Sequence, residues 1–376
     1  MISVEWMSEA QGQPDPAVSL KRVLRDDGHT DPAADPFLSS ELLLRMHREM
    51  CRIRVLDARM VALQRQGRIA FFGSSLGQEA TPVAAACAIE PRDWVFPALR
   101  ESAIMLVRGF PLEKYLAQVF GNQLDVLKGR QMPSHLSARA VNQVSWSSCI
   151  ATQLPHAVGA AWAAKKRGDS VVTLGFLGDG ATSQPDFHAA MNFAAVFKAP
   201  CVIICQNNQW SLSLPVSRQT ASQTLALKAR AYGMPGIRVD GNDVLAVHST
   251  VSAACERARR GGGPTFIEAL TYRLGASSTV DDPSRYRSEA ESREWESKDP
   301  INRLAVHLRH LGVLDDLLEQ TQMQEINDEI SAAIAAVEHL PPPERASLFE
   351  DVYQEQPWHL REQCRDLLAC PPVGRL

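Results

Sequence analysis

Two short polar motifs hold residue types that could do chemistry. Gly178, Asp179 and Gly180 end the apolar run VVTLGFL, and Asn207 and Asn208 follow a second apolar run, CVIIC. A carboxylate and an amide oxygen are hard ligands that suit Mg²⁺, which usually completes its octahedron with water and phosphate oxygens. The two glycines would let the backbone approach a diphosphate closely, and a helix that follows would direct its N-terminal amide groups at the anion. The motifs therefore predict a site for a diphosphate and its metal ion.

The segment between the motifs predicts how they come together. Residues 185–197 carry apolar side chains at mostly helical spacing, namely Phe187, Ala190, Met191, Ala194 and Val196. A strand, a helix and a second strand in this order form a right-handed crossover, in which the two strands are parallel. Because the carboxyl ends of parallel strands lie at one edge of the sheet, we expect Asp179 and Asn208 to converge on one ligand there.

Predicted strands and helices alternate along the rest of the chain. A long helix is expected to begin after Ser39 or Ser40 and to end at Gly67. Further helices are expected over residues 79–89, 102–120, 151–168, 220–231 and 244–260, and further strands from 95, over 237–241 and over 266–270. Residues 271–299 are polar and predict a functional loop, and helices follow it. The pattern predicts an α/β fold with a mostly parallel sheet.

Composition argues against several classes of protein. The 376 residues are 45% hydrophobic and 22% charged, as in ordinary globular proteins, and the net charge of −4 gives no support for a nucleic-acid partner. No segment has the roughly 18 uninterrupted apolar residues of a membrane span. The eight cysteines lack paired CxxC spacing, which disfavours a zinc site and favours reduced thiols. Because the N-terminus also lacks an export or transit signal, we expect a cytoplasmic protein.

Several further motifs extend over most of the chain. They are GRQMPSH (129–135), ATQLPHAVGAA (151–161), RVDGNDVLAVH (238–248), TYRLG (271–275), DDPSRYR (281–287), DPINRL (299–304) and FEDVYQEQP (349–357). With them, residues 40–362 resemble the alpha subunit of the decarboxylating component of branched-chain 2-oxoacid dehydrogenases, a family related to the pyruvate and acetoin dehydrogenases. The resemblance implies the thiamine diphosphate-binding fold, with helices on both faces of the sheet.

Composition and the resemblance together predict how the chain is divided. Residues 1–36 are rich in Pro, Asp and Gly and lack sustained periodicity, so they would form a partly irregular N-terminal arm that lies over a partner or is partly disordered. Residues 37–345 would form the thiamine diphosphate-binding α/β domain, which holds the diphosphate half of a cofactor site. Residues 346–376 would form a C-terminal tail.

The ligands of the cofactor follow from the resemblance as well. Asp179, Asn208 and the backbone carbonyl of Trp210 would bind Mg²⁺. Thiamine diphosphate would be bound by Arg100, Ser148, Ile150, Gly178, Asp179, Gly180, Ala181, Gln206 and Asn208. A monovalent cation, K⁺, would be bound by Ser147, Cys149, Thr152 and Gln153. The nearby loop would be ordered by Arg273, Asp281, Tyr286 and Arg287.

The activity of the family involves two partner proteins. The cofactor adds to the keto group of a 2-oxoacid, CO₂ departs, and the acyl unit passes to a lipoyl group of an acyltransferase. The glutamate that activates the cofactor belongs to a separate beta subunit. The resemblance therefore implies a 2-oxoacid dehydrogenase of α₂β₂ composition that depends on thiamine diphosphate and Mg²⁺ and acts on branched-chain substrates.

Position 277 departs from the family pattern. The family usually has a histidine immediately before Ser278, where it contacts the reacting centre, and this chain has Ser277. A serine hydroxyl cannot shuttle protons near neutral pH, so Ser277 marks an altered catalytic position. Two other functions stay open for this reason. One is a related enzyme that passes the acyl unit to another acceptor, by carboligation or by transfer to a carrier protein. The other is a non-catalytic, cofactor-binding paralogue that partners a beta subunit.

Overall fold

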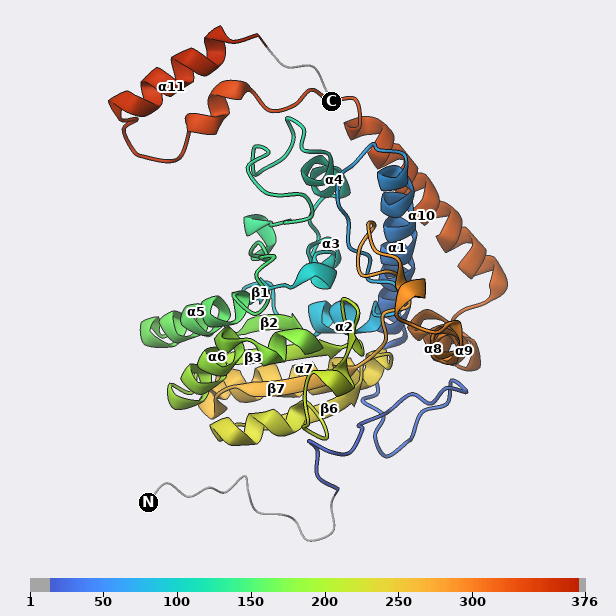
Figure 1. Cartoon of the computed structure of the whole chain (residues 1–376). Helices are drawn as coiled ribbons and strands as arrows, with labels where there is room; N and C mark the ends of the chain where they lie inside the picture. The colour runs from blue at the N-terminus through green and yellow to red at the C-terminus, as the bar shows by residue number, and fades with distance from the viewer. Residues whose placement is uncertain (1–13, 372–376) are drawn as a thin grey trace.

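A five-stranded sheet forms the centre of the molecule, which is described here by a computed structural model of residues 14–371. Every strand runs parallel to its neighbours, in the order β1-β2-β3-β7-β6 (Figure 1). The strands are β1 (Trp94–Phe96), β2 (Thr173–Gly178), β3 (Cys201–Asn207), β6 (Gly236–Asp240) and β7 (Thr265–Leu270). This arrangement confirms the predicted α/β class and the parallel sheet.

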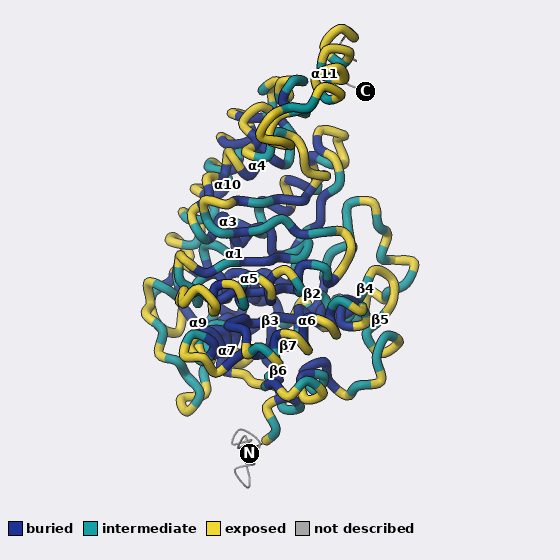
Figure 2. Tube along the Cα trace, turned by 90° about the vertical axis from the view of Figure 1, so that its left-hand side faces the viewer, coloured by how far each residue is buried: buried dark blue, intermediate teal, exposed yellow. Residues whose placement is uncertain are grey.

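Helices cover both faces of the sheet. One face packs with α2 (Ala80–Ala88) and α7 (Val244–Arg257), and the other with α5 (Gln153–Arg167) and α6 (Pro185–Val196). Side chains of β3 alternate between the two layers, since Val202 and Ile204 belong to the first hydrophobic cluster and Ile203 to the second. A strand buried on both faces reads as one apolar run, which is why CVIIC shows no alternation. Figure 2 shows the sheet as the buried centre of the molecule.

The predicted strand, helix and strand are confirmed by β2, α6 and β3. β2 pairs with β3 in parallel, from Thr173 opposite Cys201 to Gly178 opposite Gln206. A 3₁₀ turn, η4 (Asp179–Ser183), separates β2 from α6, and α6 begins at Pro185, whose fixed φ suits a first helical turn. The two polar motifs therefore follow two paired strand ends.

The prediction of one continuous helix over residues 102–120 is wrong. The structure has two helices there, α3 (Ile104–Val107) and α4 (Leu112–Phe120). Gly109 between them has a φ of 90°, and Pro111 precedes α4 and has no amide hydrogen to donate to α3. Both residues are helix breakers, so the sequence itself contained the signal for the interruption.

Two other segments differ from the prediction. The helix expected over residues 220–231 is a short 3₁₀ helix, η6 (Ala226–Tyr232). The polar segment 271–299 contains a helix, α8 (Glu289–Glu296), which was predicted as loop. The side chain of Ser288 caps α8 by accepting a hydrogen bond from the amide of Glu291. A local cap thus makes a helix from a sequence without an apolar stripe.

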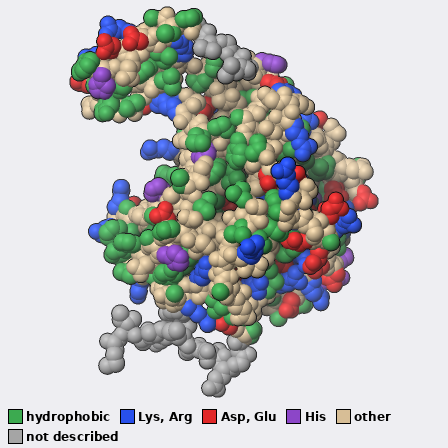
Figure 3. All heavy atoms as spheres, viewed as in Figure 1, with side chains coloured by type: hydrophobic (Ala, Val, Ile, Leu, Met, Phe, Trp, Pro, Cys, Tyr) green, Lys and Arg blue, Asp and Glu red, His purple; other side chains and the backbone are tan. Residues whose placement is uncertain are grey.

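Two further helices, α9 (Pro300–His310) and α10 (Asp316–Val337), pack against α1 (Ser40–Arg65), which is capped by Ser39. The last helix, α11 (Trp358–Ala369), packs against η9 (Arg345–Phe349) and lies away from the sheet (Figure 1). None of the described side chains of α11 is buried, and Figure 3 shows an open hollow beneath this C-terminal segment. Tyr353 and Trp358 are among its exposed aromatic residues. Within residues 14–371, no helix has both the length and the apolar character needed to cross a membrane.

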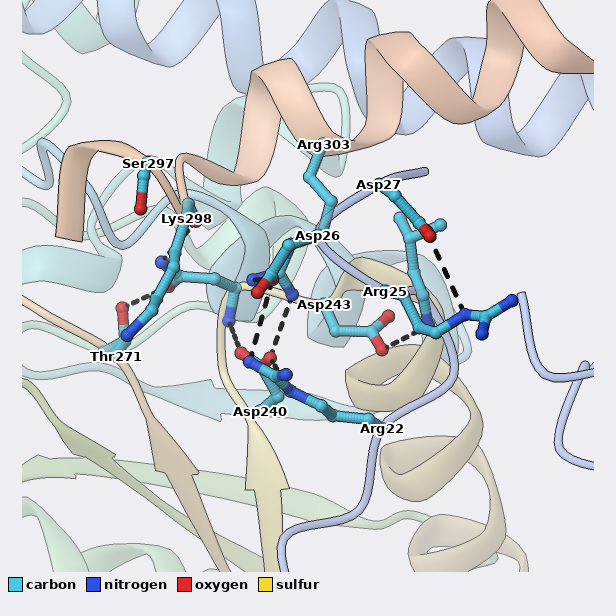
Figure 4. A network of polar contacts seen from close by, with 12 residues as sticks. Arg22, Arg25, Asp26, Asp27, Asp240, Asp243, Thr271, Ser297, Lys298 and Arg303 are labelled. Atoms are coloured by element: carbon cyan, nitrogen blue, oxygen red, sulfur yellow. Dashed lines mark hydrogen bonds and ion pairs between the residues drawn. The ribbon is translucent and has the colours of Figure 1, made fainter. Parts of the chain in front are cut away.

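The segment before α1 is tied to the body by buried charges. Arg22 Nε donates to Asp240 Oδ2 at 2.7 Å, and Arg303 of α9 donates to the same oxygen at 2.9 Å (Figure 4). Asp243 accepts a hydrogen bond from the backbone amide of Val23 at 2.6 Å. Residues 14–36 therefore lie along β6, α7 and α9 of their own chain.

Candidate functional site

A cavity of about 360 Å³ lies at the carboxyl ends of four strands. One predicted lining residue follows each strand: Arg100 after β1, Asp179 after β2, Asn208 after β3 and Arg273 after β7. The other predicted residues that line it are Ser147, Ser148, Ile150, Gln153, Gly178, Gly180, Ala181, Gln206, Trp210 and Ser277. Parallel strands that end at one edge account for this convergence.

Asp179 and Asn208 offer the oxygen atoms that a hard cation would need. Asp179 is 2% exposed, and its Oδ2 accepts a hydrogen bond from Gln219 Nε2 at 3.2 Å. Burial raises the pKa of Asp179 to about 6. Asn208 Oδ1 accepts from the amide of Trp210 at 3.2 Å, and Nδ2 donates to Gln78 Oε1 at 2.9 Å. A buried carboxylate whose pKa stays raised although backbone amides and nearby arginine charges counter the burial, beside a fixed amide oxygen, fits a divalent cation.

Two guanidinium groups give the cavity a positive wall. Arg100 Nη2 donates to the carbonyl of Ser277 at 2.8 Å, and its Nη1 donates to the carbonyl of Ser74. Burial, and then the charge of Arg273, lower the pKa of Arg100 to about 10. Arg273 Nη2 donates to Tyr286 Oη at 2.8 Å, and burial lowers the pKa of Arg273. Two buried cations with lowered pKa values fit an anionic ligand such as a diphosphate.

Three small residues at the end of β2 and directly after it, Gly178, Gly180 and Ala181, differ in their surroundings. A side chain at Gly178 would meet nothing within 4 Å, so this position leaves open space in the cavity. A side chain at Gly180 would collide with Ser211, so glycine is needed there for protein packing as well. Ala181 is buried and lines the cavity. The predicted close approach of a diphosphate therefore has room at Gly178.

Ser148 and Ile150 form an exposed edge of the cavity. Ile150 is 47% exposed, and Ser148 is exposed as well. Ser148 Oγ lies 2.9 Å from His135 Nε2, and His135 Nδ1 lies 2.9 Å from the carbonyl of Pro133. His135 was not predicted as a site residue, although it lies in the GRQMPSH motif. Its only signal was an imidazole in a segment, 129–148, that contains no Asp or Glu.

The four predicted cation ligands lie in one turn at the start of α5. Thr152 Oγ1 donates to the carbonyl of Cys149 at 2.7 Å, and the amide of Cys149 donates to Ser147 Oγ at 3.2 Å. Gln153 Nε2 donates to the carbonyl of Phe176 at 2.6 Å. Gln153 Oε1 is buried and lacks a hydrogen-bond partner among residues 14–371. The turn thus contains a free acceptor, but Cys149 and Thr152 do not line the cavity.

The loop after β7 is held by the predicted network. Asp281 Oδ2 accepts from the amide of Ser277 at 2.7 Å and from Tyr286 Oη at 2.5 Å. Arg287 Nη2 donates to the carbonyl of Leu274 at 2.7 Å. Asp281, Tyr286 and Arg287 lie outside the cavity lining. They hold the backbone at Leu274 and at the amide of Ser277, a residue that lines the cavity.

Gln206, which was predicted to bind the cofactor, lines the cavity and also contacts a second buried residue. Its Nε2 donates to Glu101, a buried residue whose pKa is raised by burial, and its Oε1 has no partner in the described part of the chain. Glu101 and Gln78 are further lining residues that sequence reasoning missed. Glu101 could have been found, since it directly follows Arg100. Gln78 gave no local signal, because its contact with Asn208 spans 130 residues.

Comparisons with known proteins agree with the fold and with the resemblance predicted from the motifs. The family model described as "Dehydrogenase E1 component" matches residues 47–346. The chain is 40% identical over 362 residues to "2-oxoisovalerate dehydrogenase subunit alpha 2, mitochondrial" of Arabidopsis thaliana, which covers 96% of this chain and 76% of the relative. It is 42% identical over 344 residues to subunit alpha 1 of the same plant, covering 91% and 73% of the two chains.

A human protein is similar to the same extent. The chain is 40% identical over 352 residues to "2-oxoisovalerate dehydrogenase subunit alpha, mitochondrial" of Homo sapiens, which covers 93% of this chain and 79% of the relative. The family match and these identities confirm the resemblance predicted from the motifs. The chain therefore belongs to the dehydrogenase E1 component family, whose members depend on thiamine diphosphate.

Proposed function

We propose that this chain is the alpha subunit of a thiamine diphosphate-dependent dehydrogenase that decarboxylates branched-chain 2-oxoacids. The relatives named as 2-oxoisovalerate dehydrogenase alpha subunits support the substrate class. One observation carries the proposal: Asp179, Asn208, Arg100 and Arg273 converge on one cavity at the carboxyl edge of the sheet.

Each residue of the cavity has a task in this function. Asp179, Asn208 and the carbonyl of Trp210 would hold Mg²⁺, and the contact of 3.4 Å from Arg273 Nη1 to that carbonyl is long enough to yield. Arg100 and Arg273 would balance the charge of the diphosphate. When bound, thiamine diphosphate supplies the electron sink that the loss of CO₂ requires.

The proposal includes a K⁺ ion at the turn of residues 147–153. Gln153 Oε1 supports it, because a buried acceptor that finds no donor in the described residues favours a cation. A cation there would also engage the Cys149 carbonyl, which now accepts from Thr152.

A beta subunit and an acyltransferase complete the proposal. The relatives are named as alpha subunits, which supports an assembly with a beta chain, and we propose the α₂β₂ composition. The exposed Ile150 at the cavity edge supports a partner that covers this side. A lipoyl acyltransferase is the proposed acceptor. The cytoplasmic location stays a prediction, and the relatives compared are mitochondrial proteins.

Ser277 favours a second candidate function. Its backbone amide donates to Asp281 and its carbonyl accepts from Arg100, so the backbone of Ser277 is held at the border of the cavity. This chain therefore places a hydroxyl where the family pattern has an imidazole. Such a change favours transfer of the acyl unit to an acceptor other than a lipoyl group.

One assay separates these functions. The chain is co-expressed with a beta subunit, supplied with thiamine diphosphate and Mg²⁺, and tested on 3-methyl-2-oxobutanoate with an artificial electron acceptor and then with a lipoyl domain. We expect turnover with both. Turnover with the dye alone would support another acceptor, and cofactor binding without any turnover would support a non-catalytic paralogue.

A further inference from the structure

His135 is the histidine of this chain that contacts the cavity wall. All ten histidines lie within the described residues, and His135 alone among them hydrogen-bonds a side chain that lines the cavity. It is 7% exposed, so its ring is separated from bulk solvent by protein. Since Ser277 carries no titratable group, this imidazole is the candidate to exchange protons with the cavity.

The ring of His135 is held on three sides. Its face stacks on Trp146, with ring centres 4.2 Å apart and 13° between the planes. Nδ1 lies 2.9 Å from the carbonyl of Pro133, which can only accept, so Nδ1 carries a hydrogen. Nε2 of the neutral ring is therefore an acceptor, and the hydroxyl of Ser148 at 2.9 Å donates to it. This is the arrangement in which an imidazole activates a hydroxyl.

The pair also joins two cavities. Ser148 lines the cavity at the strand ends, whereas His135 lines a second cavity of about 540 Å³ between the end of α1, the end of α4 and residues 343–348. The charged residues of the second cavity are Arg68, Asp125, Lys128, Glu344 and Arg345, and those of the first are Arg100, Glu101, Asp179 and Arg273. Protons can thus reach the imidazole from a polar cavity outside the site.

We propose that His135, acting through Ser148, supplies and accepts protons for the reaction in the cavity. In one direction a group in the cavity gives its proton to Ser148 Oγ as the hydroxyl proton passes to His135 Nε2, which leaves an imidazolium. In the other direction the imidazolium returns a proton through the same hydroxyl. No atom other than hydrogen moves, and charge is conserved. The inference rests on the proposed function, since it names how that site exchanges protons.

A thiol in place of the Ser148 hydroxyl tests the basicity of His135 without cofactor or turnover. The full-length chain, purified with its beta subunit, carries S148C together with C149A, so that the introduced thiol is the reactive group of its peptide. Its alkylation by iodoacetamide is followed against pH by mass spectrometry, and compared with the same protein carrying H135N. We expect alkylation at pH 7 to be about tenfold faster with His135 present, because an adjacent imidazole favours the thiolate. Equal rates in the two proteins would overturn the proposal.

Turnover gives a second and independent test. H135N, H135Q and S148A are each compared with the unchanged enzyme for kcat against pH, for thiamine diphosphate affinity and for Tm. We expect each to lower kcat by about 10² or more with cofactor affinity retained, and S148A combined with H135N to cost no more than either alone. A pH profile that H135Q leaves unchanged would contradict the relay.

The results that would refute the relay differ from those that would refute the proposed function. An unchanged enzyme that binds no thiamine diphosphate would refute the function whatever the thiol does. A functional enzyme in which the introduced thiol reacts equally fast with and without His135 would refute the relay alone. A loss of Tm common to H135N and H135Q, without a change in alkylation, would assign His135 to holding the loop and would also overturn the proposal.

Discussion

The two sides of the cavity differ in how far this chain builds them. On the strand side, Asp179, Asn208 and Arg273 are 2%, 6% and 1% exposed, and each follows a strand of the central sheet. On the opposite side, Ser148 is exposed and Ile150 is 47% exposed, in a turn before α5. The strand side is fixed by the core, whereas the opposite side has few partners in its own chain.

This difference separates two tasks of the site. The strand side holds the groups for a metal ion and an anion, so the affinity for the diphosphate should depend on this chain. The exposed side presents an apolar side chain and a hydroxyl, so its final geometry should depend on whatever covers it. Substitutions on the two sides should therefore change different quantities.

The largest effect is expected from D179A. Removal of the carboxylate leaves Asn208 and one carbonyl for the metal, so we expect Mg²⁺-dependent binding of thiamine diphosphate to become undetectable, a loss of at least about a hundredfold. Titration calorimetry with and without Mg²⁺ measures it. D169A, which removes an exposed aspartate, is the control and should bind as before. An unchanged affinity of D179A for thiamine diphosphate would show that Asp179 does not bind the metal ion of the cofactor.

S277H is expected to have the next largest effect. A histidine there restores a titratable group at the border of the cavity, and general acid and base assistance is worth about 10²- to 10⁴-fold. We expect transfer to a lipoyl domain to rise about 10²-fold, with decarboxylation changed less. Rates with a dye and with a lipoyl domain are measured side by side. A fall in both would mean that Ser277 is adapted to another acceptor.

The smallest effect is expected when an isoleucine is truncated on the exposed side of the cavity. It is measured against truncation of an isoleucine on the strand side. Ile203 is fully buried in β3, so I203A should lower the free energy of unfolding by about 2–5 kcal/mol. Ile150 is exposed, so I150A should change it by no more than about 0.5 kcal/mol in the chain without its partner. Urea unfolding measures both. If I150A lowered the free energy of unfolding as much as I203A, Ile150 would be packed in the core. The contrast between the two sides of the cavity would then be wrong.

The strand side was predictable from the sequence because each of its features is local. Apolar runs that end in GDG and NN give the strand ends, and the helical spacing between them gives the crossover. The register of β2 and β3 then brings Asp179 and Asn208 together without further information. Arg100 and Arg273 came from the family resemblance, and their approach depends on strands far apart in the chain.

The contacts that were not predicted join residues that no local sequence pattern connects. Gln78 reaches Asn208 across 130 residues, and His135 reaches Ser148 from the far end of an irregular loop. No periodic pattern in the sequence points to Gln78 or to His135 as a residue of the site. The helix α8 escaped for another reason, since a cap at Ser288 and acidic residues in its first turn stabilise a helix that no apolar stripe announces.

The exposed helix α11 should affect how fast the chain is degraded before it assembles with a partner. None of its described side chains is buried, its first residue Trp358 is exposed, and Tyr353 just before it is exposed as well. Proteases and chaperones recognise accessible aromatic side chains on a loosely attached segment, so a chain made in excess of its partner should be cut near residues 350–357 and removed. The supply of the partner would then set how much of this protein a cell retains.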